Sequence, residues 1–207
     1  SSPRPDEFST GSNGFAIAPA RTVNGHAILY INPHVTFYFR PEIHVISEEG
    51  LNAYGAITWG QLFVYQGFNE HCGWMHTSGY SDVADNYAEQ VIKKGNALFY
   101  KYNNTLRPVK QQVVTLRYRD GNAIKTKAIT TYATHHGPVM ASRNGQWISV
   151  KSNNRSMKAL IQSWLRTKAN GFEAFKKNME LLSNSSNNTV FADDKGNIAY
   201  WHGNFIP

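Results

Sequence analysis

The sequence predicts an α+β fold in which most of the sheet is antiparallel. Short apolar segments separated by turn residues fill the first 150 positions, and two helical patterns and a last pair of strand-like segments follow. Consecutive strands with short connections pair antiparallel, and helices that follow them cover a face of the sheet. With 207 residues, of which 41% are hydrophobic, the chain is long enough to bury a sizeable core.

The first predicted strands follow a polar, Pro-containing segment at residues 1–11, which we interpret as a linker. The apolar runs "GFAIAP" and "HAILYIN" flank the turn residues Val23-Asn24-Gly25 and predict a hairpin. The stretch "NAYGAITWGQLFVYQGFN" continues as strand-like segments that Gly55, Gly60 and Gly67 are expected to separate.

Residues 96–150 predict further strands, with a hairpin in "QQVVTLRYRDGNAIKTKAITTYAT" that turns at Asp120-Gly121. The apolar spacing then becomes helical, and the two helical stripes are Met157, Leu160, Ile161, Trp164 and Leu165, then Phe172, Phe175, Met179 and Leu182. Asn170-Gly171 is expected to end the first helix. "TVFADDKGNIAYW" predicts a last hairpin that turns at Asp194-Lys195-Gly196.

Composition and single residues exclude several classes of function. The net charge is +7, but no run of Lys and Arg exceeds two, which argues against a nucleic-acid interface. No segment approaches the roughly 20 apolar residues of a membrane span. Cys72 is the only cysteine, so we expect a small buried thiol rather than a catalytic residue. If His135 and His136 lie in a strand, they point to opposite faces and share no metal ion.

Three polar stretches remain as candidates for chemistry: Gly11-Ser12-Asn13 before the first strand, Asn32-Pro33-His34 at the end of the next, and "WMHTSG". Taken singly, a serine in a turn and a histidine at a strand end are ordinary structural residues. The chain contains no Gly-x-Ser-x-Gly elbow, no His-Glu-x-x-His helix and no phosphate-binding glycine loop.

The order of these stretches resembles the penicillin acylase family, in the N-terminal-nucleophile hydrolase superfamily. The resemblance rests on "GSN", on "NPH" 22 residues after Ser12, on "GFNEHCGWMHTSGYSDVADNYAE", on "HGPV" and on "FADDKGNIAYW". No single block is specific, but their order from about residue 11 onward matches the N-terminal part of the large (β) subunit of that family.

The resemblance implies an αββα sandwich with the serine on a central strand, of which this chain would be a part rich in antiparallel β. It also implies that a precursor cleaves itself between Gly11 and Ser12. The freed Ser12 hydroxyl would attack an amide carbonyl, with its own α-amine as general base. A free α-amine has a pKa near 8, which suits that task. The expected substrates are N-acylated small molecules such as penicillins, cephalosporins or acyl-homoserine lactones.

Other roles carry over by the same resemblance. The backbone N–H of Ser78 would stabilise the oxyanion, His34 would position the substrate or attacking group, and Asn13 would hold the turn. A structural calcium ion, found in some family members, would be bound by Asp82, Ala84, Asp85 and Pro207. The alternative for the two aspartates is that of ordinary loop carboxylates. No cofactor is required for the reaction.

The chain also departs from the family pattern. Ser12 follows 11 residues, so its nitrogen is an amide without a basic lone pair. The second oxyanion donor, an asparagine, and its supporting arginine would follow Pro207, and the small (α) subunit is absent. We therefore expect residues 12–207 to be part of an N-terminal-nucleophile domain that is inactive alone. Its partners would be the small subunit and the rest of the large subunit, and the parent would be periplasmic or secreted.

A second function stays open from the sequence alone. The Tyr, Trp and Phe residues, 13% of the chain, are also typical of a β-rich module that binds carbohydrate without catalysis. That alternative does not explain the spacing of the "GSN", "NPH" and "GWMHTSG" blocks.

Overall fold

The computed structural model describes residues 11–36, 39–79, 82–152, 156–183 and 186–203. These residues form two compact units, each described here by itself. The first unit combines the chain up to Val83 with the chain from Asn153 onward, and the second spans Ala84–Ser152. Among the described residues, no helix is long and apolar enough to cross a membrane.

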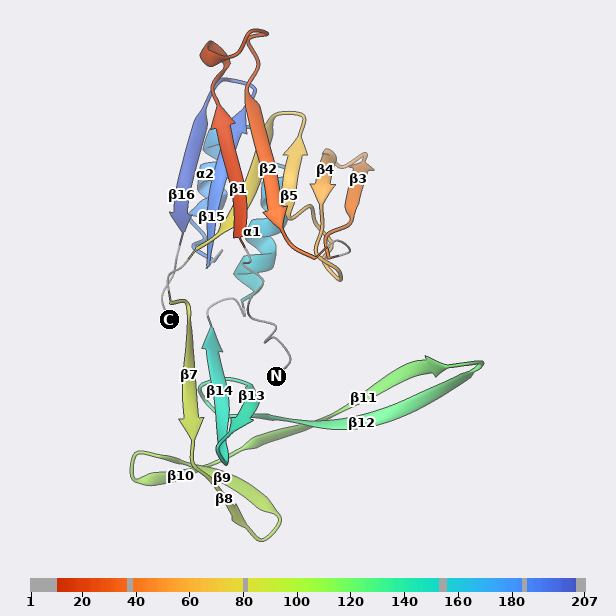
Figure 1. Ribbon diagram of the computed structural model, residues 1–207, viewed down its shortest axis with the longest axis vertical. Coiled ribbons are helices and arrows are strands. Elements are labelled where there is room, and N and C mark those ends of the chain that lie inside the picture. Colours follow the sequence, from red (N-terminus) through yellow and green to blue (C-terminus); the bar gives the residue numbers. More distant parts are fainter. Residues whose placement is uncertain (1–10, 37–38, 80–81, 153–155, 184–185, 204–207) are drawn as a thin grey trace, which may run out of the picture. The chain divides into compact units, whose positions relative to one another are not determined.

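The first unit contains a two-stranded sheet and a six-stranded sheet, both antiparallel (Figure 1). The small sheet pairs β1 (Gly11–Ile17) with β2 (Ile28–His34), connected through the 3-10 turn Pro19–Arg21, which confirms the first hairpin. The large sheet has the order β16-β15-β6-β5-β4-β3. Its strands are β3 (Glu42–Ser47), β4 (Leu51–Ala56), β5 (Gln66–Asn69), β6 (Cys72–Ser78), β15 (Asn187–Asp193) and β16 (Ile198–Gly203).

The two sheets pack face to face, and the helices cover the opposite face of the large sheet. On the side of β1 and β2, a Cβ added to Gly14 would lie 2.3 Å from Sδ of Met75 on β6. On the other side, Trp74 and Phe191 form one buried cluster with Phe175 of the second helix. Alternation along β6 therefore sends neighbouring side chains into two different interlayer cores.

Both predicted helices are present, as α1 (Met157–Thr167) and α2 (Phe172–Met179), although Leu182 of the second stripe lies beyond α2. The apolar stripe of α1 is exposed, and its buried residues are Gln162, Arg166 and Thr167. The Ser156 side chain accepts a hydrogen bond from the Lys158 N–H and caps α1. The prediction that Asn170-Gly171 ends the first helix is wrong in detail. That helix stops at Thr167, and Gly171, with φ of 134°, is instead the N-cap residue of α2.

Two of the three glycines expected to separate strands lie inside them. Gly55 of β4 and Gly67 of β5 are directly paired, and only Gly60 lies in a connection. A Cβ on Gly55 would lie 2.3 Å from the Gln66 carbonyl oxygen and 2.6 Å from Cα of Gly67. These glycines therefore allow two backbones to approach closely rather than ending the strands.

We expect Gly55→Ala to destabilise the protein by about 3 kcal/mol. The residue has φ of 153°, which L residues rarely adopt, and the new methyl group would clash with rigid backbone. Urea denaturation of the full-length protein measures this cost. Gly50→Ala is the matched control, because Gly50 also has positive φ but a Cβ added there would meet no atom within 4 Å. Equal losses for both variants would contradict the close-approach explanation.

The second unit is entirely β among its described residues. Its strands are β7 (Ala84–Glu89), β8 (Val91–Lys94), β9 (Ala97–Tyr102), β10 (Thr105–Pro108), β11 (Lys110–Asp120), β12 (Ala123–Ala133), β13 (Val139–Arg143) and β14 (Gln146–Ser152). They form the sheets β10-β9-β8, β11-β12 and β13-β14-β7. The predicted hairpin is confirmed as β11–β12, although its two connecting residues are Gly121 and Asn122.

Candidate active site

Ser12 lies at the start of β1, on the face that packs against the large sheet. Strand alternation places it on the same side as Gly14, which meets Met75. The side chain is half-buried, and its Oγ donates a hydrogen bond of 2.6 Å to the carbonyl oxygen of Gly11. The hydroxyl therefore lies against the peptide group that would be cleaved.

The register of β1 and β2 brings the side chains of Asn13 and His34 together on one face of the small sheet. Gly11 is paired with His34 in the ladder, and a Cβ on Gly11 would lie 3.5 Å from His34 Nδ1. The Asn13 amide nitrogen lies 3.3 Å from His34 Nε2. Asn13 and His34 therefore lie together on the outer face of the small sheet, beside the Gly11 backbone, whereas the Ser12 side chain points to the opposite face.

Ser78 is the last residue of β6, the strand whose Met75 packs under β1. The Asn188 amide of β15 holds this strand end by donating to Thr77 Oγ1 at 3.1 Å and to the Ser78 carbonyl oxygen at 3.4 Å. His202 of β16 lies 2.7 Å from Asn188 Oδ1 and fixes the orientation of that amide. Sequence reasoning missed Asn188, since an isolated asparagine in a Ser/Asn-rich stretch carries no distinguishing signal.

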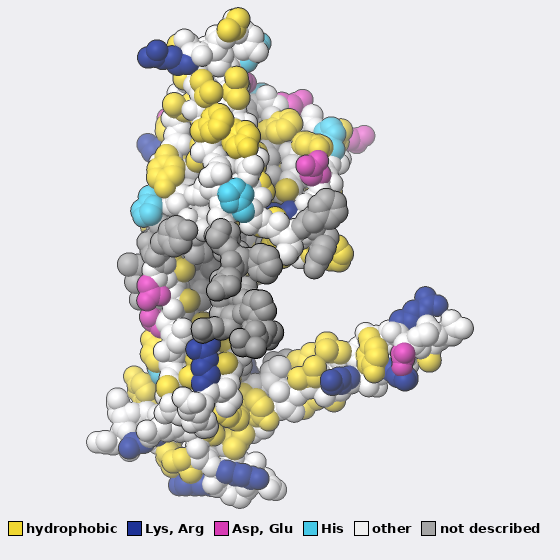
Figure 2. Space-filling view, viewed as in Figure 1, with side chains coloured by type: hydrophobic (Ala, Val, Ile, Leu, Met, Phe, Trp, Pro, Cys, Tyr) yellow, Lys and Arg dark blue, Asp and Glu magenta, His cyan; other side chains and the backbone are white. Residues whose placement is uncertain are grey.

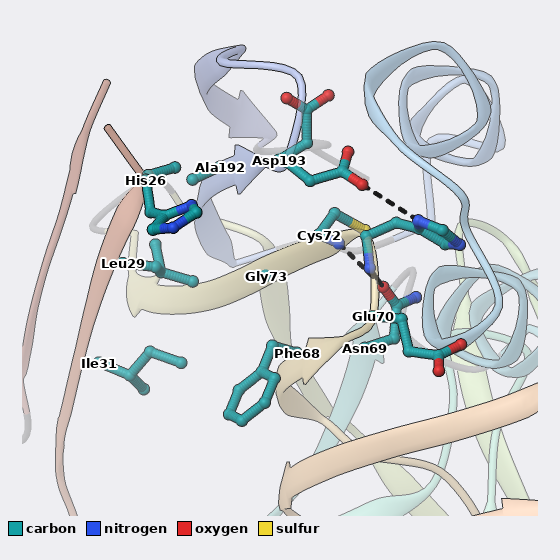
Figure 3. A pocket seen from close by; sticks show the side chains of 13 residues that line it. His26, Leu29, Ile31, Phe68, Asn69, Glu70, Cys72, Gly73, Ala192 and Asp193 are labelled. Carbon is teal, nitrogen blue, oxygen red and sulfur yellow. Dashed lines mark hydrogen bonds and ion pairs between the residues drawn. The ribbon is translucent and has the colours of Figure 1, made fainter. Parts of the chain in front are cut away.

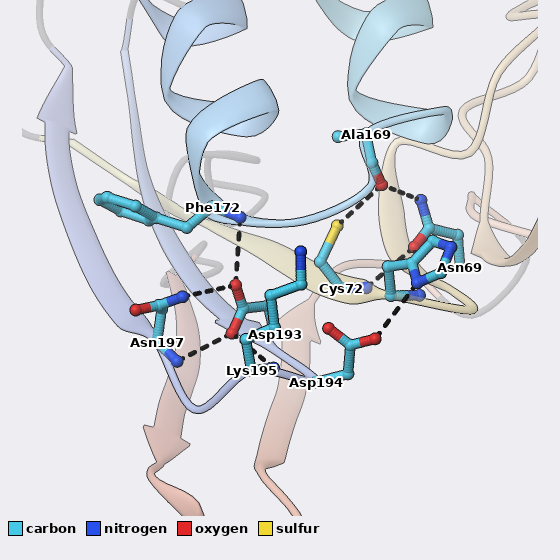
Figure 4. Close-up of polar contacts among 9 residues, drawn as sticks. Asn69, Cys72, Ala169, Phe172, Asp193, Asp194, Lys195 and Asn197 are labelled. Carbon is cyan, nitrogen blue, oxygen red and sulfur yellow. Dashed lines mark hydrogen bonds and ion pairs between the residues drawn. The ribbon is translucent and has the colours of Figure 1, made fainter.

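Asn69, in the block "GFN", connects the large sheet to the end of α1. Its Oδ1 accepts hydrogen bonds from the backbone N–H groups of His71 and Cys72, both at 2.9 Å. Its amide nitrogen donates to the carbonyl oxygens of Thr167 and Ala169, at 3.1 and 2.8 Å (Figure 4). The side chain therefore satisfies backbone groups at a strand turn and at a helix end at once.

Asp193, in the block "FADDKGN", connects the last hairpin to the start of α2. One carboxylate oxygen accepts from the Phe172 N–H and the Asn197 amide, and the other from the backbone N–H groups of Lys195 and Asn197 (Figure 4). Burial acts to raise the pKa of Asp193, but these hydrogen bonds outweigh it and hold the pKa below the ordinary value. Two of the blocks that carry the resemblance are thus structural junctions.

Cys72 is a buried thiol, as predicted, and its Sγ donates to the Ala169 carbonyl oxygen at 3.4 Å (Figure 4). Burial is the main cause that raises its pKa to about 12. A nucleophilic cysteine needs a lowered pKa and access to solvent, so this environment does not support the catalytic alternative.

A buried pair connects α1 to β6 on the helix side of the sheet. The guanidinium of Arg166 lies 2.9 Å from Nε2 of His76, and His76 Nδ1 lies 3.0 Å from the Thr189 hydroxyl. Burial first, and then the charge of Arg166, keep the pKa of His76 well below its usual value. Burial also lowers the pKa of Arg166 to about 10. His76 is therefore a neutral hydrogen-bond partner in the core.

A pocket of about 330 Å³ opens between β2 and the β5–β6 turn (Figure 3). Apolar side chains of Leu29, Ile31 and Phe68 form one wall, and Glu70 and Asp193 lie at its polar end. Ser12, His34 and Ser78 are not among its lining residues. The pocket therefore lies apart from the Ser12 group in the described part of the chain.

The expectation that His135 and His136 point apart is wrong, because they lie in a bend after β12 rather than in a strand. Their ring centroids are 3.8 Å apart. His136 Nδ1 lies 2.9 Å from Glu89, which also accepts from Thr134 and Ser149. Burial acts to raise the pKa of Glu89, but these hydrogen bonds outweigh it and lower that pKa. The cluster fastens the bend to β7 and β14.

The residues named for calcium fall in both units and beyond the described residues. Asp82 belongs to the first unit, Ala84 and Asp85 begin β7 in the second, and Pro207 lies outside the described residues. The Asp85 carboxylate accepts a hydrogen bond from Tyr87 at 3.2 Å. Within the described ranges, no group of three or more His, Cys, Asp and Glu side chains lies close enough to hold a metal ion. The calcium site stays a prediction.

Comparison with known proteins finds similarity to one family and to acylases. The penicillin amidase family matches residues 2–207. The acyl-homoserine lactone acylase PvdQ of Pseudomonas fluorescens is 26% identical over 95% of this chain and 27% of its own length. The acyl-homoserine lactone acylase QuiP of the same species is 30% identical over 65% of this chain and 16% of its own length.

The fold has a counterpart among solved structures. A thermostable penicillin G acylase from Alcaligenes faecalis superposes with a TM-score of 0.67 and 24% identity over 95% of this chain and 35% of the enzyme chain. This chain thus spans about a quarter of the curated relative that it matches over most of its own length. Because the family match extends over nearly every residue, the chain belongs to the penicillin amidase family.

Proposed function

We propose that this chain is the nucleophile-bearing part of an amidohydrolase that cleaves N-acylated small molecules through Ser12. One observation carries the proposal. In a chain of this family, the Ser12 hydroxyl lies 2.6 Å from the carbonyl oxygen of the preceding residue, at the start of a strand that faces the large sheet. We infer that a hydroxyl held against this peptide group can reach its carbonyl carbon.

The first step of the proposal is self-cleavage. The Ser12 oxygen forms a bond to the Gly11 carbonyl carbon while its proton moves to the Ser12 nitrogen, and the peptide C–N bond breaks. Water then hydrolyses the resulting ester, which leaves a carboxylate on Gly11 and a free α-amine on Ser12. The new amine supplies the general base that the amide nitrogen cannot provide.

The mature site then carries out acyl transfer. The α-amine accepts the hydroxyl proton as Ser12 Oγ attacks the substrate carbonyl, and the amine product departs with that proton. Water releases the acid from the acyl-enzyme by the reverse proton path. His34 lies beside the Gly11 backbone, which supports its proposed positioning role, and its contact with Asn13 supports the proposal that Asn13 holds the turn. The Ser78 N–H is proposed as an oxyanion donor, and the Asn188 contacts that hold this strand end support it.

The same proposal includes the αββα sandwich and the missing partners. The small sheet, the large sheet and the helix pair are consistent with three of its layers. Phe15 and Tyr30 stack at 4.8 Å on the outer face of the small sheet and remain exposed, which supports a further layer over them. That layer would come from the small subunit or the rest of the large subunit, in a periplasmic or secreted protein.

The names of the relatives indicate which substrates to test. We expect the full-length protein to hydrolyse penicillin G or an N-acyl-homoserine lactone, with release of the free amine. Rapid quenching should trap an acyl group on the peptide that begins with Ser12, detected by mass spectrometry. Substrate turnover with no acylated Ser12 peptide would contradict the proposed mechanism, and carbohydrate binding without hydrolysis would favour the binding-module alternative.

A further inference from the structure

The β11–β12 hairpin is a long ribbon with almost no protection from solvent (Figure 1). Each strand has 11 residues, a length of about 35 Å, and every residue of β11 is exposed. Large apolar side chains of the two strands are among the exposed ones: Leu116 and Tyr118 are both 47% exposed, and Ile129 is 38% exposed. A two-stranded ribbon is marginally stable at best in water, so its exposed apolar residues need a covering surface.

One face of the ribbon combines apolar and cationic side chains in cross-strand rows. The register pairs Val114 with Ile129, Leu116 with Lys127, and Tyr118 with Lys125. Directly opposed residues share a face, so these six residues form one surface, here called the Val114 face. Figure 2 shows hydrophobic side chains alternating with Lys and Arg along this hairpin.

The charge of the hairpin is strongly one-sided. Lys110–Ala133 contains five Lys and Arg residues and one acidic residue, Asp120, which pairs with Lys125. A surface that accepts the Val114 face must therefore bring a carboxylate to Lys127, whose charge no acidic residue of the hairpin balances, and apolar groups to cover Leu116 and Ile129.

We propose that the Val114 face docks onto an acidic surface with an apolar centre on the part of the full-length protein that lies outside this chain. The length of the relatives supports this source, since 95% of this chain corresponds to 27% of a relative. Docking within one protein also costs little translational entropy, because the partner surface is held at a high effective concentration.

Other occupants fit the face less well. A second copy would bring two cationic faces together, and like charges repel. A lipid bilayer would leave the unpaired outer edges of the two strands without hydrogen-bond partners in its apolar region. A nucleic acid would meet Val114, Leu116 and Ile129 at the centre of the face, where base edges and phosphates require donors.

Side-chain footprinting of the full-length protein tests the proposal. After division by the intrinsic reactivity of each residue type, we expect hydroxyl radicals to label Leu116 and Tyr118 several-fold more slowly than Ile124, which lies on the opposite face. The double variant Lys125→Glu/Lys127→Glu should restore rapid labelling of Leu116 and Tyr118. The matched control Arg117→Glu/Arg119→Glu reverses two charges on the opposite face and should leave that protection unchanged.

Each alternative outcome overturns the proposal. Labelling of Leu116 as rapid as that of Ile124 would mean that the face is uncovered. Protection that increases with protein concentration would indicate a second copy. Protection that requires phosphatidylglycerol vesicles or duplex DNA would indicate those ligands instead. None of these readouts depends on Ser12, so the proposal stands or fails separately from the acylase function.

Discussion

Replacing Ser12 by alanine in the full-length protein is expected to leave an uncut precursor and to lower kcat/KM for an N-acyl substrate by on the order of 10⁴-fold or more. The variant lacks the Ser12 oxygen, which lies 2.6 Å from the Gly11 carbonyl oxygen. Without it, the chain cannot cleave itself and no acyl-enzyme can form. Gel analysis of processing and an assay of released amine measure the two effects.

Two controls make this result specific. Ser47→Ala removes an exposed serine at the end of β3 and should change neither processing nor turnover. Ser12→Cys keeps a nucleophile at the same place and should retain more processing than Ser12→Ala. Wild-type rates in the alanine variant would show that another group performs the reaction.

Replacing Asp193 by alanine is expected to lower the free energy of unfolding by about 3 to 5 kcal/mol. The carboxylate accepts four hydrogen bonds, two on each oxygen, and is 2% exposed. Urea denaturation of the full-length protein measures the loss. Asp194→Ala removes a neighbouring carboxylate that is 46% exposed and pairs with His71, so it should cost much less. Similar losses for both variants would contradict the role of Asp193 as a junction.

The pH dependence of this effect has a definite sign. The pKa of Asp193 in the folded protein lies below the ordinary value of 3.8, so its carboxylate stabilises the fold above that value. The contribution is lost as the pH falls through the lowered pKa. The stability difference between wild type and Asp193→Ala should therefore be constant near neutral pH and become smaller below about pH 4.

Periodicity and turn residues were enough to predict the local structure. The helical stripes, the hairpins and the antiparallel pairing depend on side-chain patterns over short segments, which the sequence displays directly. Glycine was harder to interpret. In the sequence, Gly55 and Gly67 look like residues that end strands. In the structure, they allow the backbones of two paired strands to approach closely, and the sequence does not show which backbone lies opposite.

The candidate site was predictable as far as neighbouring strands position it. His34 lies opposite Gly11, the residue before Ser12, because one hairpin register pairs their strands. The sequence assigns no role to Asn69, Asp193 or Asn188, because their hydrogen-bond partners lie in distant segments. The Asn69 amide, for example, donates to the carbonyl oxygen of Ala169. The side-chain directions of His135 and His136 differ from the prediction, because the two residues lie in a bend, where the alternation of a strand does not apply.

Intact-mass analysis with N-terminal sequencing of the full-length protein shows whether the chain is cut before Ser12. We expect a large chain whose first residue is Ser12, with a free α-amine, and the absence of that species in Ser12→Ala. A wild-type protein that remains uncut at Gly11-Ser12, yet hydrolyses an N-acyl substrate at the same rate as its Ser12→Ala variant, would contradict both the self-cleavage and the role of Ser12 as nucleophile.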